Sequence, residues 1–124
     1  MIPTKSRLDT LTRDFADTPR HRLMPVVGDS MAPTVPPGAI VAVAPIDHFD
    51  GAGLYVYHDG LGPIVVRAEW SLGEQCVCLS FDNHRYSSFN RSLEEFTQHV
   101  LGKVFAKIDV IEPDLIARVD RPAR

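Results

Sequence analysis

The stretch VVGDSMAPTVPPGAIVAV, Val26–Val43, decides how the chain folds. Gly28 and Asp29 favour a turn that presents Ser30, and two adjacent prolines bend the chain again before Gly38. The run AIVAV that follows is made of small and β-branched apolar residues, which is typical of a buried strand. The stretch therefore predicts two strands joined by a turn that carries a serine.

Further β-rich runs lie on both sides of this stretch. They are HRLMPVVG, GLYVYHD, GPIVVRAEW and QCVCLSF, each bounded by glycine, proline or aspartate. Asp59 and Gly60, between two of the runs, form a pair typical of a β-hairpin turn. The later run GKVFAKIDVI alternates as a half-buried strand with Phe105 on its polar face. Its apolar face is expected to carry Val104, Ala106, Ile108 and Val110.

One short helix and one further helical turn are predicted beside the strands. Leu8, Leu11 and Phe15 recur at helical spacing near the N-terminus. Further along, Ser92 and Glu95 form a capping box for about one helical turn. We therefore expect a mainly β fold of short antiparallel strands with one short N-terminal helix.

The domain organisation follows from these patterns. We expect an N-terminal helical segment at residues 1–20, one β domain at residues 21–112, and a weakly patterned tail at residues 113–124, of which ARVDRPAR, residues 117–124, is expected to be mobile. The N-terminal helix is too short to form a helix-turn-helix domain, which needs about three helices. The chain is therefore predicted to carry no DNA-reading domain of its own.

Composition and charge narrow the class of protein. The 124 residues are 44% hydrophobic and 23% charged, which is typical of a single globular domain. The net charge of -3 argues against a surface that grips nucleic-acid phosphates. No apolar run is long enough to span a bilayer or to serve as a secretory signal. We therefore predict a cytoplasmic protein without direct nucleic-acid or membrane contact.

The cysteines indicate neither a disulfide nor a metal site. Cys76 and Cys78 are the only two, and their spacing places both on one face of a strand, where they are expected to be reduced packing residues. As zinc ligands they would need a second closely spaced pair. The histidines form no such pair; they are His21, His48, His58, His84 and His99. We expect no metal and no cofactor.

The serine stretch resembles the nucleophile motif of the LexA, UmuD and phage CI-type repressor family, whose C-terminal domains are self-cleaving serine peptidases. The matching positions are Gly28, Asp29, Ser30, Met31, Pro33, Thr34 and Gly38. Three further segments resemble that family in the same order along the chain: GAGLYVYHDG its hairpin strand, LSFDNHRYSSF its Ser-Asp-Asn-x-x-Tyr segment, and VLGKVFAKIDVI its closing strand. The resemblance implies the LexA-like peptidase fold of the β-clip type.

The catalytic lysine of that family has no counterpart here. A serine is a weak nucleophile until a base accepts its proton, and in the family a buried lysine is that base. Aligning IVVRAEW with the family's Val-Lys-Arg-Leu strand sets Val66 at the lysine position and Arg67 at the arginine. Shifting by one residue puts Arg67 at the lysine position, but a guanidinium stays protonated in proteins. Self-cleavage by the family route is therefore expected to be lost.

Other residues of the motif segments remain candidates for the site. The resemblance implies a cleft formed by Arg67, Asp82, Asn83 and Tyr86. Two histidines, His58 and His84, are possible substitute bases, because an imidazole titrates near neutral pH. Without a base, the Ser30 hydroxyl is expected to bond to the backbone of its turn. No Ala-Gly or Cys-Gly bond, which the family cleaves, lies within residues 1–29.

These expectations favour association over catalysis. The first hypothesis is a non-catalytic, repressor-like pseudo-peptidase domain in phage or prophage regulation, which forms a homodimer or a heteromer with a phage or host repressor. Phe105 is the candidate interface residue. Two alternatives stay open: an active serine peptidase with an atypical base, cleaving itself or another chain, and the C-terminal part of a longer DNA-binding repressor.

Overall fold

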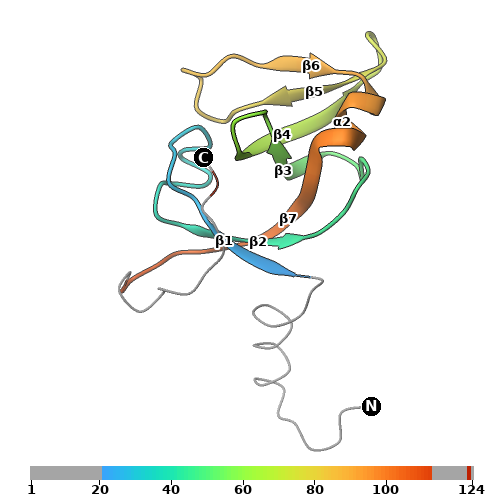
Figure 1. Cartoon of the computed structure of the whole chain (residues 1–124). Coiled ribbons are helices and arrows are strands. Elements are labelled where there is room, and N and C mark those ends of the chain that lie inside the picture. Colours follow the sequence, from blue (N-terminus) through green and yellow to red (C-terminus); the bar gives the residue numbers. More distant parts are fainter. Residues whose placement is uncertain (1–20, 113–122, 124) are drawn as a thin grey trace, which may run out of the picture.

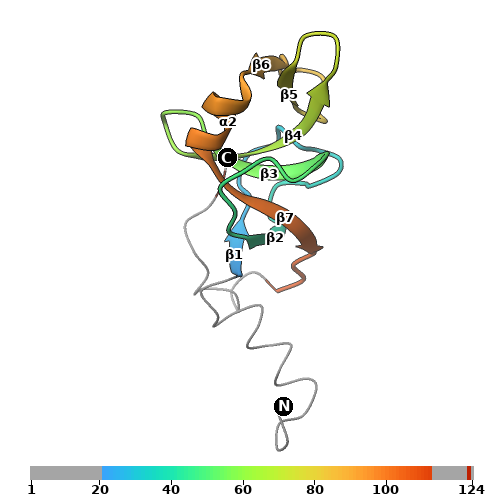
Figure 2. The same cartoon turned by 90° about the vertical axis from the view of Figure 1, so that its right-hand side faces the viewer.

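The computed structural model describes residues 21–112 and Ala123, and it is drawn in Figures 1 and 2. The predicted N-terminal helix lies outside these residues, as does the tail apart from Ala123. Along the chain the elements are β1 (Arg22–Pro25), β2 (Ile40–Ala44), β3 (Gly53–His58), β4 (Pro63–Ser71), β5 (Cys76–Ser80), β6 (Phe89–Arg91), α2 (Leu93–His99) and β7 (Val100–Ile108). The prediction of a mainly β fold is confirmed.

The seven strands form one antiparallel sheet in the order β1-β2-β7-β3-β4-β5-β6. The last of the described strands along the chain, β7, lies between β2 and β3 and pairs with both. Figure 1 shows β1 and β2 at one end of the molecule, and β5, β6 and α2 at the other. The two ends are therefore joined through β7.

The hairpin between β3 and β4 turns at the predicted place. The Asp59 carboxylate accepts hydrogen bonds from the backbone N–H groups of Leu61 (2.9 Å) and Gly62 (3.1 Å). Gly60 has a φ of 98°, a backbone conformation that favours glycine. The aspartate and the glycine therefore act together to close this turn.

Two apolar clusters form the core, one on each face of the β3–β4 hairpin. Val56 and Val65 face the first cluster, whereas Tyr55 and Val66 face the second. The first cluster also contains Val26, Met31, Val35, Ala39, Val41, Val43 and Ala123. The second also contains Tyr57, Ile64, Ala68, Val77, Leu79, Phe96 and Val100. Because both of its faces are covered, the hairpin is the structural centre of the fold.

Helix α2 begins at the predicted capping box. Ser92 Oγ accepts a hydrogen bond from the backbone N–H of Glu95 at 3.1 Å, and the Glu95 carboxylate accepts one from the Ser92 N–H at 3.3 Å. The helix buries Phe96, whose ring lies 5.2 Å from that of Tyr55 and 5.7 Å from that of Tyr57. The cap therefore positions an aromatic anchor of the second cluster.

Strand β7 departs from the simple alternation predicted for it. Its pairing with β2 passes from Ala42–Ala106 to Val43–Val104, which makes Phe105 the extra residue of a β-bulge. Its pairing with β3 skips Leu101 in the same way. Both side chains are exposed, and Ile108, expected on the apolar face, is exposed as well. The exposure of Phe105 was predicted correctly, but the apolar face was predicted to extend too far.

Candidate functional site

The residues Gly28–Gly38 form a compact turn, called here the serine turn. The Ala32 N–H donates to Asp29 O at 3.1 Å, and the Val35 N–H donates to Met31 O at 2.8 Å. The side chains of Met31 and Val35 are buried in the first cluster. Because these two apolar side chains anchor the turn, Ser30 is held in place and is only 8% exposed.

The segment after β5 forms hydrogen bonds to the serine turn. The Asn83 N–H donates to Ser30 O at 3.0 Å, and Asn83 Nδ2 donates to Asp29 O at 3.0 Å. The Tyr86 hydroxyl donates to Asp29 Oδ1. This bond to the Asp29 carboxylate raises the pKa of Tyr86. Two of the predicted cleft residues, Asn83 and Tyr86, are thus brought directly to the serine.

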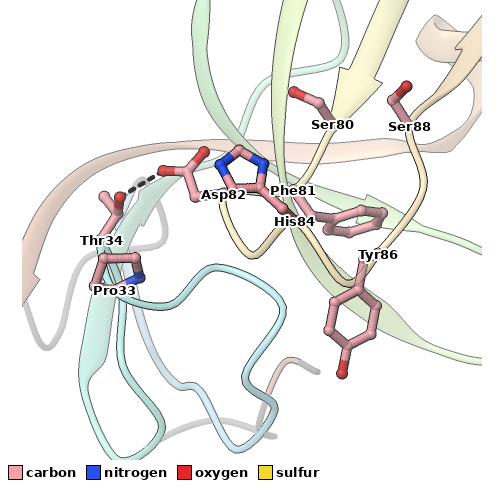
Figure 3. Close-up of a pocket in the computed structure, with 8 residues that line it drawn as sticks. All are labelled: Pro33, Thr34, Ser80, Phe81, Asp82, His84, Tyr86 and Ser88. Carbon is pink, nitrogen blue, oxygen red and sulfur yellow. Dashed lines mark hydrogen bonds between the residues drawn. The ribbon is translucent and has the colours of Figure 1, made fainter.

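An ion pair ties the same turn to β4. Arg67 donates from Nε and Nη2 to the two carboxylate oxygens of Asp82, at 2.8 and 2.7 Å. The Thr34 hydroxyl donates to Asp82 Oδ2 at 2.5 Å, as Figure 3 shows. The hydrogen bonds from Arg67 are the main cause that lowers the pKa of Asp82. The Arg67–Asp82–Thr34 contact is called here the acidic clamp.

Ser30 opens into a pocket of about 390 Å³. The other lining residues are Gly28, Asp29, Asp59, Ile64, Phe81 and Tyr86. The lining thus supplies two carboxylates and a phenol, but no amine and no imidazole. The Asp29 carboxylate accepts from Tyr86, and the Asp59 carboxylate closes the hairpin turn. The described lining of this pocket therefore contains neither the lysine nor the histidine that commonly accepts the proton of a nucleophilic serine.

Val66, at the expected lysine position, is fully buried in the second cluster. It does not line the Ser30 pocket. The β4 residue that does so is Ile64, two positions earlier in the same cluster as Val66. Arg67 belongs to the opposite side of the strand and reaches the serine turn through the acidic clamp.

The two histidines considered as substitute bases lie elsewhere. His58 is exposed, and its Nδ1 accepts a hydrogen bond from the Gly60 N–H at 3.1 Å within the hairpin turn. His84 is exposed and lines a neighbouring pocket beside Asp82. Neither histidine lines the pocket of Ser30.

The Ser30 hydroxyl does not behave as expected from the sequence. Within residues 21–112 and Ala123, no hydrogen bond of Ser30 Oγ is present; the serine takes part through its backbone carbonyl, which accepts from Asn83. The expected hydroxyl-to-backbone bond is therefore wrong. Ser30 is instead one of the residues that line a pocket.

A second pocket, of about 560 Å³, lies beside the acidic clamp and is shown in Figure 3. It is lined by Pro33, Thr34, Ser80, Phe81, Asp82, His84, Tyr86 and Ser88. Ser80, Ser88 and the pairing of Thr34 with Asp82 were not predicted from the sequence. Nothing in the local pattern indicates that pairing, because the two residues are 48 positions apart.

The described residues show no sign of a metal centre. Among residues 21–112 and Ala123, no group of three histidine, cysteine or acidic side chains is arranged to hold a metal ion. Cys76 and Cys78 are free, half-buried thiols. In the same residues, no helix has the length and apolar character needed to cross a membrane.

No protein-family model matches the sequence, and no curated protein matches it either. The functional argument therefore rests on the residues and their geometry.

Proposed function

We propose that this chain is a non-catalytic, LexA-like pseudo-peptidase domain that acts by association. Its partner is a second copy of the chain or a transcriptional repressor of a phage or its host. The resemblance of four ordered segments to the LexA, UmuD and phage repressor family motivates the fold type and the regulatory role. Free thiols at Cys76 and Cys78 are compatible with the cytoplasm, where such regulators work.

The observation that carries the proposal is the composition of the Ser30 pocket. Catalysis by serine needs a proton acceptor within hydrogen-bond reach, about 3 Å. The carboxylates of Asp29 and Asp59 are already engaged by hydrogen bonds, and the described lining of the pocket contains neither an amine nor an imidazole. A general base contributes about 10²- to 10⁴-fold in rate, so its loss removes most of the activity of such a site.

The proposed contact surface is the part of β7 that exposes Leu101 and Phe105. These two apolar side chains stand at the positions of the two β-bulges, and each is nearly half exposed. Bulges re-aim side chains out of a sheet, which makes them suitable for binding. The ring of His21 lies 5.0 Å from that of Phe105 and extends the apolar surface.

The association is tested by substituting the exposed aromatic residue. Phe105 is 46% exposed, so covering the rest of its ring is worth about 1 kcal/mol per copy. In a symmetric dimer the residue acts twice, and Phe105→Asp should weaken dimerisation about 30-fold. Sedimentation equilibrium measures the dissociation constant directly.

The matched control is Leu72→Asp, which removes another exposed apolar side chain from the turn between β4 and β5. It should leave the dissociation constant unchanged. If the wild-type chain is a monomer at tens of micromolar and binds no repressor of this family, the proposed association is wrong.

The loss of catalysis is tested separately. Wild type and Ser30→Ala are incubated at neutral and raised pH with and without a candidate repressor, and mass spectrometry follows any cleavage. Both should leave every chain intact. Cleavage by the wild type that disappears in Ser30→Ala would show that the pocket has a working base and would overturn the non-catalytic assignment.

A further inference from the structure

Ala123, in the tail, is built into the fold. Ala123 forms a parallel β-bridge with Val26, in which its N–H donates to Pro25 O at 2.7 Å and its carbonyl accepts from the Val27 N–H at 3.1 Å. Its methyl group is fully buried in the first cluster. Part of the tail predicted from the sequence thus belongs to the core.

The segment that receives Ala123 has hydrogen bonds on both sides. On the inner side, the Val26 N–H donates to Ala39 O at 2.9 Å, and Val26 O accepts from the Gly38 N–H at 2.7 Å. The backbone groups of Pro25 and Val27 point to the other side, which is the outer edge of the sheet. Only Ala123 occupies that edge among the described residues. Pro25, Val26 and Val27 are called here the tail-binding edge.

The bridge position accepts only a small side chain. The Ala123 methyl lies in the same buried cluster as Val26, Met31 and Val35, each of which is at most 2% exposed. Close packing of this kind leaves no room for a longer or charged side chain without a large cost. The edge thus selects its occupant by backbone pairing and by side-chain size, as in strand addition to an exposed sheet edge.

We propose that the tail-binding edge is a peptide-binding site, and that the occupant it takes in trans is the tail of a second copy of this chain. The tail of every copy carries the alanine that the edge is seen to hold. Ten residues, 113–122, separate Glu112 from Ala123, and a chain of that length can span about 33 Å. The tail is therefore long enough to reach a neighbouring molecule.

The direction of the bridge sets one end of the edge beside the serine turn. In a parallel pairing a bound peptide runs the same way as Val26 and Val27, toward Gly28 and Asp29. Asp29 also lines the Ser30 pocket, so the edge ends beside that pocket. The site is distinct from the proposed contact surface on β7, so it does not depend on the proposed function.

The test uses a fluorescent peptide with the sequence LIARVDRPAR, residues 115–124, and measures its binding to full-length chains by anisotropy. In the wild type the chain's own tail competes for the edge, so the peptide should bind weakly. Ala123→Glu expels that tail by burying a charge and should bind the peptide at least about tenfold more tightly. The matched control Ala52→Glu, at an exposed alanine, should bind like the wild type.

Two further measurements make the test specific. The same peptide with glutamate in place of its penultimate alanine should bind Ala123→Glu at least about tenfold more weakly. Adding Val27→Pro to the Ala123→Glu chain removes the backbone N–H that donates to the carbonyl of the bound alanine. This change should weaken binding of the peptide by a similar factor. Circular dichroism checks that each variant is folded.

If Ala123→Glu does not fold, Ala123→Gly replaces it, because it removes only the buried methyl. It should tighten peptide binding about fivefold relative to the wild type. The proposal is overturned if the peptide binds the wild type as tightly as it binds the variant of Ala123 that folds. It is also overturned if the peptides with alanine and with glutamate at the penultimate position bind equally tightly. The same holds if the alanine peptide binds no chain at about 1 mM.

Discussion

Replacing Asp82 with asparagine should weaken the contact between the serine turn and β4. The substitution keeps the size of the side chain but removes the charge that Arg67 pairs with and one of the acceptor oxygens used by Arg67 and Thr34. The Arg67 side chain is 41% exposed, so the ion pair is screened by water and is worth about 1 kcal/mol. The bond from Thr34 adds about 1 kcal/mol. Asp82→Asn should therefore lower the free energy of unfolding by about 2 kcal/mol.

The same carboxylate makes this stability depend on pH. Because the pKa of Asp82 is lower in the folded chain than in the unfolded chain, its contribution is complete above the unfolded pKa of about 3.9. The contribution is lost as the pH falls through the lower, folded value. Urea unfolding at pH 7 and at about pH 2 should therefore show a large difference between Asp82→Asn and wild type only at pH 7.

A control separates the clamp from a general effect of removing charge. Asp47 is an acidic residue whose side chain is almost fully exposed, and Asp47→Asn should change the free energy of unfolding by less than about 0.5 kcal/mol. The reasoning is refuted if Asp82→Asn is as mild as the control at pH 7. It is also refuted if the destabilisation by Asp82→Asn is as large at pH 2 as at pH 7.

Three further substitutions test the scaffold around the site. Gly102→Ala sets a Cβ 2.5 Å from Val43 Cγ1 and should cost more than about 2 kcal/mol in urea unfolding, whereas Gly73→Ala, which meets nothing within 4 Å, should stay within about 0.5 kcal/mol. Val66→Lys buries an amine and should cost more than about 3 kcal/mol at neutral pH, with partial recovery at pH 10 as the amine is neutralised. Ser92→Ala removes the cap of α2 and should cost about 1 kcal/mol, measured by the thermal midpoint.

Local patterns predicted the elements of this fold well. Turn chemistry at Asp59 and Gly60 located the β3–β4 hairpin, and Ser92 with Glu95 located the start of α2. These features depend on residues within a few positions of one another. Strand β6 was missed because its three residues are too few to form a pattern.

The long-range features could not be predicted in the same way. The bulge at Phe105 depends on how β7 registers against its partner strand, and an alternating pattern carries no information on an extra residue. The burial of Ala123 depends on an edge formed about a hundred positions earlier in the chain. The site was predicted in part: Asn83 and Tyr86 do contact the serine turn, but Ile64 rather than Val66 lines the pocket of Ser30.

The central position of β7 imposes an order on synthesis and folding. The strand that joins β2 to β3 is the last of the described strands to leave the ribosome, so β1 and β2 have no partner sheet until about residue 108 has been made. Until then β2 and β3 each present an open edge, which is prone to pairing with other chains. A chain interrupted before residue 100 should therefore aggregate or be degraded rather than persist as a smaller folded unit.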